Sequence, residues 1–262
     1  MITYIREQNR KHTIVSSIIL TIITLIIGSL FVWDNNPITG LDKLTNDILI
    51  SIFCIFVIYL LCLNKTAGFQ KEGFWKGMLY GIPFLVIGIG ACMISNIGTN
   101  IFELKPISFV GVLLFTINML FVGINEELSM RSLVLNNLML KYGKDRKGVY
   151  KALIIAAMIF GAIHLVNIFF VPPITVIVQA INAASAGVLF GAIFICSKNV
   201  WACIMIHAMV DWISLFVGQC FIGGESVLSI EMTVLQGIVM VILGAVPPII
   251  IAVLLMRKKY KS

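Results

Sequence analysis

The sequence predicts an all-α membrane protein with about eight transmembrane helices in one bundle. Of its 262 residues, 60% are hydrophobic and 12% are charged, and the mean hydropathy is +1.04. A soluble domain is roughly 45–50% apolar and about 25% charged. The apolar residues also form runs long enough to cross a bilayer of about 30 Å. We therefore expect residues 1–262 to form a single transmembrane domain.

Eight apolar segments follow one another along the chain, separated by polar or turn-rich loops. The first is uncharged and too long for the core of a signal peptide, so we expect a retained anchor. The fourth is longer than a membrane is thick, so its last turns should emerge on one side. The predicted spans are 13–33, 48–63, 77–97, 108–140, 150–171, 174–196, 201–217 and 232–256.

The positions of the positive charges predict how this bundle is oriented. Of the 19 Lys and Arg residues, sixteen lie in the two terminal segments and in the loops on the same side of the predicted bundle. The opposite loops hold only Lys43 and Lys105, and Arg131 lies within a span. By the positive-inside rule, the protein is an integral, multi-pass membrane protein with both termini cytoplasmic. We expect its positive charges to face the anionic lipid bilayer and not nucleic acid.

Three ionisable residues interrupt the fourth span: Glu126, Glu127 and Arg131. Without compensation they would cost about 8–10 kcal/mol at the centre of a bilayer. Glu127 and Arg131 are four residues apart with the acid first, which is the favourable order for an ion pair on one helix face. Glu126 is turned about 100° away from that face. It is therefore not neutralised by the same arginine and suits the role of a general base.

His164, His207 and Asp211 are the other ionisable side chains inside the predicted spans. Counting about 1.5 Å per residue places Glu127, His164 and His207 at overlapping depths, in the middle or inner half of the membrane. Asp211 follows His207 by four residues, and Phe160 precedes His164 by four, where its ring can pack against the imidazole. We interpret the set as functional, because packing alone would avoid the cost of burying six ionisable groups.

The sixth span carries a face of small residues and two amides. Ala183, Gly187 and Gly191 recur every four residues, which predicts close packing against another helix. Gln179 and Asn182 either form hydrogen bonds between helices or line a cavity. The residues alone do not separate these two interpretations.

Three motifs in order, each on its own predicted span, resemble those of the CAAX protease and bacteriocin-processing family. The similarity is to its type II CAAX prenyl endopeptidase (Abi) group of intramembrane proteases, and it covers roughly residues 70–220. The chain departs from many members at Ser132, where they have glycine. The motifs are Glu126-Glu127-x-x-x-Arg131, Phe160-x-x-x-His164 and His207-x-x-x-Asp211.

The resemblance implies an intramembrane endopeptidase that hydrolyses a peptide bond near the cytoplasmic side of the membrane. Glu126 would activate a water molecule with the help of His164, and His207 and Asp211 would stabilise the oxyanion. The substrate would be a peptide or a lipidated peptide, such as a prenylated C-terminus, a peptide pheromone or a bacteriocin precursor. The supporting residues would be Glu127, Arg131 and Phe160.

The chemistry of this residue set leaves alternatives open. A carboxylate and two imidazoles can provide a base and an electrophilic stabiliser without a metal, and we predict no cofactor. In the alternative, Glu126, His164 and His207 would hold a zinc ion with a bound water molecule. Two other functions also remain: a non-catalytic bacteriocin self-immunity or scaffold protein of the same fold, and a proton-coupled transporter.

Overall fold

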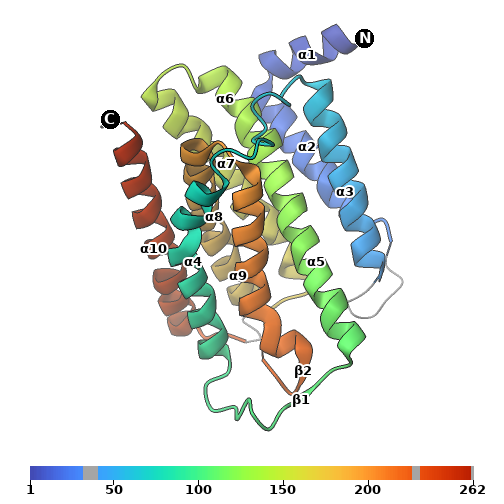
Figure 1. The fold of residues 1–262 in the computed structure, drawn as a ribbon, viewed down its shortest axis with the longest axis vertical. Helices are drawn as coiled ribbons and strands as arrows, with labels where there is room; N and C mark the ends of the chain where they lie inside the picture. Colours follow the sequence, from blue (N-terminus) through green and yellow to red (C-terminus); the bar gives the residue numbers. More distant parts are fainter. Residues whose placement is uncertain (32–40, 226–230, 261–262) are drawn as a thin grey trace.

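A computed structural model describes residues 1–31, 41–225 and 231–260. In these residues nearly all regular structure is helical, and the helices form one bundle (Figure 1), which confirms the predicted fold class. The elements are α1 (Ile2–Lys11), α2 (Thr13–Gly28), α3 (Leu41–Leu60), α4 (Phe74–Ser95), β1 (Lys105–Pro106), α5 (Phe109–Glu127), η1 (Leu128–Leu135), α6 (Asn136–Tyr142), α7 (Arg146–Ile163), η2 (His164–Phe169), α8 (Pro173–Ser197), α9 (Val200–Cys220), β2 (Phe221–Ile222) and α10 (Val234–Lys259).

The helices agree with an integral, multi-pass membrane protein. Within the described ranges, seven helical stretches are long and apolar enough to cross a membrane, and the bent pair α1 and α2 would make an eighth. The chain bends by 112° between these two helices. The first predicted span, 13–33, forms a helix as far as Gly28, and Trp33 lies outside the described residues.

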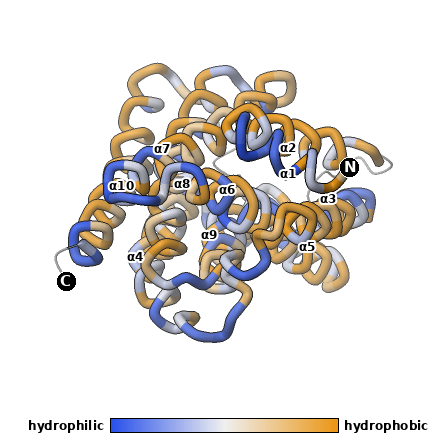
Figure 2. The backbone as a smooth tube through the Cα atoms, turned by 90° about the horizontal axis from the view of Figure 1, so that it is seen from above, coloured by the Kyte–Doolittle hydropathy of each residue, from blue (hydrophilic) through white to orange (hydrophobic). Residues whose placement is uncertain are grey.

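The two ends of the chain lie at the same end of the bundle (Figure 1). We call this the terminal end; it contains α1, the turn between α6 and α7, and the last turn of α10. The opposite, distal end carries β1 and β2, which pair as a short antiparallel ladder. Figure 2 shows the hydrophilic stretches at α1 and in the loops, while the helices around the rim are mostly hydrophobic. This arrangement fits the predicted topology, and the orientation in the membrane stays a prediction.

Side-chain caps determine where three of the helices begin. Ser108, Asp145 and Asn199 each accept a hydrogen bond from the backbone N–H three residues further on, at 3.1, 2.7 and 2.9 Å. Such a cap satisfies one of the amide groups that the first turn of a helix leaves unpaired. As a result α7 begins four residues before the predicted span 150–171.

The fourth and fifth predicted spans are not uniform α-helices. Between α5 and α6 the chain runs through the π-helical segment η1, all eight side chains of which are buried. Within η1, Ser132 donates a hydrogen bond to the carbonyl oxygen of Ala67 at 2.7 Å. After α7 the chain tightens into the 3₁₀ segment η2, which begins at His164. η1 contains Arg131 of the first motif, and η2 begins at His164 of the second. π-Helical turns are frequent at functional sites.

Small residues allow the central helices to lie close together. On α4, Gly77 and Gly81 face α9, and on α8, Gly187 and Gly191 face α7, so the close packing predicted for the sixth span is present. On α5, a Cβ atom at Gly123 would lie only 2.7 Å from the carbonyl oxygen of Ile204 on α9. Since Gly123 precedes the first motif by one turn, this contact sets the distance between the two motif-bearing helices.

Replacing Gly123 by valine should therefore push α5 away from α9. We expect a loss of stability of about 1–3 kcal/mol, as for other overpacked interiors, together with loss of peptide hydrolysis. Thermal unfolding in detergent and a peptide cleavage assay would measure the two effects. For stability, the matched control is Gly90→Val, because a Cβ at Gly90 meets no atom within 4 Å. Equal stability of the two variants would contradict the close approach of α5 and α9.

Candidate active site

The predicted catalytic residues come from three helical regions and meet at one cavity. Glu126 lies near the end of α5, His164 at the junction of α7 and η2, and His207 and Asp211 on α9. All four side chains line a cavity of about 710 Å³. The structure therefore brings together the residues that the sequence analysis selected.

His207 lies at the centre of this group. Its Nδ1 donates a hydrogen bond to Oε1 of Glu127 at 2.8 Å. On the other side of the ring, Nε2 lies 3.4 Å from Oε2 of Glu126 and 3.5 Å from Oδ2 of Asp211. Both nitrogens thus face carboxylate oxygens, and only a ring that carries a proton on each nitrogen can donate to both sides.

Glu127 connects His207 to a buried arginine. Its Oε2 lies 2.9 Å from Nε of Arg131, and the two side chains are 0% and 1% exposed. The guanidinium carbon of Arg131 lies 4.9 Å from the ring centroid of Phe160 and 5.4 Å from that of Phe190, where cation–π attraction offsets part of the cost of burial. The ion pair was predicted, but its link to His207 was not, because no spacing along the chain relates residues 127 and 207.

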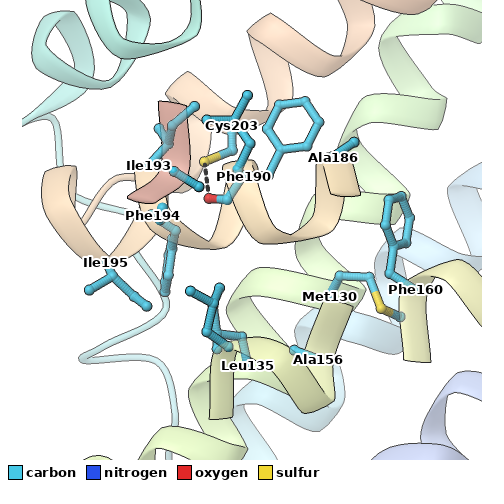
Figure 3. Close-up of a cluster of buried hydrophobic side chains, with 14 of the residues drawn as sticks. Met130, Leu135, Ala156, Phe160, Ala186, Phe190, Ile193, Phe194, Ile195 and Cys203 are labelled. Carbon is cyan, nitrogen blue, oxygen red and sulfur yellow. Dashed lines mark hydrogen bonds between the residues drawn. The ribbon is translucent and has the colours of Figure 1, made fainter. Parts of the chain in front are cut away.

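Aromatic rings hold both imidazoles in place. The ring of Phe160 packs edge-on against His164, with centroids 5.0 Å apart. Phe190 stacks on His207, with centroids 4.9 Å apart and an angle of 17° between the planes. Both rings belong to the buried cluster in Figure 3. The contact of Phe160 follows from its spacing, whereas nothing in the sequence distinguishes Phe190 from other buried residues of its helix.

The hydrogen bond of His164 defines its tautomer. Its Nδ1 lies 2.8 Å from the carbonyl oxygen of Phe160. A carbonyl oxygen only accepts, so Nδ1 carries a proton, and in the neutral form of the ring Nε2 is then the acceptor. The ring lies on the same cavity as Glu126 and Asp211, where this nitrogen can accept a proton or orient a water molecule.

A comparison with protein families agrees with this arrangement. Residues 107–213 match the family model described as Type II CAAX prenyl endopeptidase Rce1-like. The chain carries a CAAX protease domain. This confirms the resemblance drawn from the three motifs, all of which fall inside the matched range. Searches of curated proteins and of solved structures found no match to the chain.

The matched domain supports a protease activity in general. It supports a CAAX-type intramembrane protease, and a protease of this family implies a peptide substrate and contact with membrane lipid. The matched range extends from just before α5 into α9. It therefore includes every helical region that contributes a side chain of the three motifs, while α1 to α4 and α10 lie outside it.

The two amide side chains of α8 both line a cavity and form hydrogen bonds to other helices, which were the two interpretations that the sequence left open. Gln179 and Asn182 line the cavity. Gln179 also accepts a hydrogen bond from Nδ2 of Asn167 at 2.9 Å, and Asn182 donates one to the carbonyl oxygen of Met240 at 3.4 Å. Asn167, which the sequence analysis did not select, lines the cavity as well.

The cavity lies in the distal half of the bundle and is lined by residues inside and outside the matched range. Its lining residues closest to the terminal end are His207 and Phe190, and those towards the distal end include Lys43, Ile94 and Thr175. The predicted depth, in the middle or inner half of the membrane, depends on the orientation of the bundle and stays a prediction. Counting residues along a helix estimates how deep a side chain lies in the membrane. How the cavity extends from that depth depends on the packing of the helices.

A structural or catalytic metal ion would require three or more ligating side chains close together. In residues 1–31, 41–225 and 231–260, no group of three or more His, Cys, Asp or Glu side chains is arranged to hold one. Of the zinc ligands in the alternative, Oε2 of Glu126 and Nε2 of His207 are 3.4 Å apart, which is the spacing of two ligands of one tetrahedral zinc ion. A third ligand is not arranged with them in the described residues, so both the metal-free site and the zinc alternative stay predictions.

Proposed function

We propose that this protein is a glutamic intramembrane endopeptidase in which Glu126 activates the attacking water. The observation that carries the proposal is the position of His207, whose Nε2 lies 3.4 Å from Glu126 and 3.5 Å from Asp211 while Glu127 binds Nδ1. This brings a base and a hydrogen-bond donor to the same wall of the cavity. Amide hydrolysis requires both next to a single carbonyl group.

The first chemical step is attack of water on the scissile carbonyl carbon. The Glu126 carboxylate takes a proton from the water, the new C–O bond forms, and the carbonyl oxygen becomes an oxyanion. Nε2 of His164 accepts a hydrogen bond from the same water and orients it. The Glu126 side chain is 28% exposed to the cavity, so a water molecule can reach it.

The second task is to stabilise the negative charge that develops on the carbonyl oxygen. Nε2–H of His207 donates a hydrogen bond to that oxyanion. Asp211, whose Oδ2 lies 3.5 Å from the same Nε2, helps to orient the ring from the cavity side. Glu127 accepts from Nδ1 and is itself paired with Arg131, which fixes the plane of the imidazole before substrate binds. A preorganised donor of this kind typically contributes about 10²–10³-fold to the rate.

The intermediate then collapses. The C–N bond breaks as Glu126 returns its proton to the leaving nitrogen, giving a carboxyl group on one product and an amine on the other. Glu126 is again ionised at the end of the cycle. His207 keeps both of its protons throughout, so the Arg131–Glu127–His207 chain serves to position the ring.

Peptide mass spectrometry tests the proposed activity. Membrane-associated peptides would be compared between cells with the wild-type protein, with the Glu126→Gln variant and without the protein. We expect peptides that end at a common bond only with the wild type. If the same peptides form with Glu126→Gln, the protein supports processing without hydrolysing the bond itself, as a scaffold or immunity protein would.

Treatment with a chelator separates the metal-free mechanism from the zinc alternative. Because the side chains do not form a ready three-ligand set, we expect purified protein to keep its full cleavage rate after exposure to a strong chelator and removal of the chelated metal. Cleavage lost on chelation and restored by zinc would replace the glutamic mechanism with a metal-dependent one. A zinc peptidase treated in parallel controls for the efficiency of metal removal.

A further inference from the structure

A buried polar contact links α5, the helix that carries Glu126, to α3. We propose that Asn125 is a positioning residue for Glu126, and that Ser51 and Asp47 of α3 hold Asn125 in place. The inference rests on the proposed function, because it concerns the same glutamate. It adds to the active site a helix that lies outside the range matched by the family model.

Lys43, Asp47 and Ser51 form a polar stripe on α3. They follow one another at intervals of four residues, so they lie on one face of the helix. α3 begins at Leu41, which brings Asp47 into the helix although it precedes the predicted span 48–63. The side chains of Asp47 and Ser51 are buried. Because polar groups inside a membrane bundle are costly, they require partners on a neighbouring helix.

Asn125 on α5 is that partner. Oγ of Ser51 donates a hydrogen bond to Oδ1 of Asn125 at 2.6 Å, and Asn125 is 5% exposed. Asp47 interacts with the Asn125 side chain as well, and with the charge of Glu126. Lys43 pairs with Asp47 at 2.7 Å, which offsets the negative charge that Asp47 would otherwise place near Glu126. Two residues of α3 therefore act on the same buried amide.

The direction of Asn125 determines where Glu126 points. Consecutive residues of an α-helix are turned about 100° from one another. With Asn125 directed towards α3, Glu126 faces the cavity, where its Oε2 lies 3.4 Å from Nε2 of His207. The backbone changes to π-helical hydrogen bonding directly after this turn, at Leu128. Side-chain contacts of the last turn of α5 therefore help to fix its rotation, and the hydrogen bond from Ser51 is such a contact.

The kinetics of Ser51→Ala and Ser51→Thr test this role. Ser51→Ala removes the hydrogen bond to Asn125, so the last turn of α5 is freer to rotate and Glu126 is displaced from the attacking water. Because a misplacement of about 1 Å can cost about 10²-fold in rate, we expect kcat for a peptide substrate to fall by about 10–100-fold, with KM within about twofold of the wild type. Ser51→Thr keeps the hydroxyl group and should retain most of the wild-type kcat.

The matched control is a second serine that binds an asparagine on another helix. Oγ of Ser17 on α2 accepts a hydrogen bond from Nδ2 of Asn137 on α6 at 3.4 Å, and both side chains are buried. Ser17→Ala removes an equivalent contact at the terminal end. It should lower thermal stability to a similar extent as Ser51→Ala but leave kcat unchanged. If the two variants lose kcat equally, the loss reflects a general loosening of the bundle and not the position of Glu126.

Asn125→Ala tests the same contact from the other helix and covers a failure of Ser51→Ala to fold. It should show the same fall in kcat with KM unchanged. Wild-type kcat in either folded variant contradicts the positioning role, as does a folded Ser51→Thr protein that loses as much kcat as Ser51→Ala. Glu126→Gln is measured in parallel. If Glu126→Gln loses cleavage while Ser51→Ala and Asn125→Ala keep it, only the positioning role fails, whereas full cleavage by Glu126→Gln overturns the proposed function itself.

Discussion

Replacing Glu126 by glutamine should lower the rate of peptide hydrolysis by about 10²–10⁴-fold, the usual contribution of a general base. Glutamine keeps the size of the side chain and can still receive a hydrogen bond from His207, but it cannot accept the proton of the attacking water. The expected loss is therefore in kcat, with little change in KM. Cleavage of a peptide substrate by purified protein in lipid vesicles measures both constants.

The control for this variant is another glutamate that lies away from the cavity. Glu103 is exposed in the loop before β1, where it accepts a hydrogen bond from Asn100, and Glu103→Gln should keep the wild-type rate. Thermal unfolding of both variants shows whether they are folded. A Glu126→Gln protein that is folded and retains more than about a tenth of the wild-type kcat would rule out Glu126 as the base.

Replacing Glu127 by leucine should destabilise the protein by about 3–5 kcal/mol, because it leaves the buried Arg131 guanidinium without its counter-charge. Arg131→Met should have a similar effect through the unpaired Glu127 carboxylate. The matched control is Lys43→Met, which breaks another i,i+4 ion pair. Lys43 is 25% exposed and its partner Asp47 is 8% exposed, so water reaches this pair more readily than the Glu127–Arg131 pair, and the change should cost less than either variant of that pair. Unfolding by denaturant in detergent measures all three differences.

The double variant Glu127→Leu with Arg131→Met separates stability from catalysis. Replacing both members of a buried ion pair by apolar residues is often neutral for stability, so we expect most of the loss to be recovered. Activity should not return, because Nδ1 of His207 has lost the acceptor that fixes its orientation. Recovery of both stability and cleavage would show that Glu127 has no role in positioning His207.

Much of the candidate site follows from local rules. An acid four residues before a base places Glu127 and Arg131 on one helix face, and the same spacing brings Phe160 to His164 and His207 to Asp211. Charged residues in apolar spans are costly, so their presence at similar depths on three helices already indicated a shared cavity. These arguments need only the period of a helix and the thickness of a membrane.

Contacts between distant segments were not predictable in this way. The hydrogen bond between Glu127 and His207 and the stacking of Phe190 on His207 join helices whose rotation about their axes is fixed by packing. The π-helical turn of η1 was also missed, because the composition of that segment is compatible with an ordinary α-helix. Its side chains are buried on all sides, and tertiary packing decides their backbone geometry.

The sequence by itself determined that this protein is a helical membrane protein, which side of its bundle carries the positive charge, and which six ionisable side chains lie among the apolar spans. Hydrophobic length, charge and helical period are properties of neighbouring residues and can be read from their order. Only the tertiary structure decided that Glu127 joins Arg131 to His207 and that the cavity lies in the distal half of the bundle. Both depend on which side chains fill the space between helices, and that is settled when the whole bundle packs.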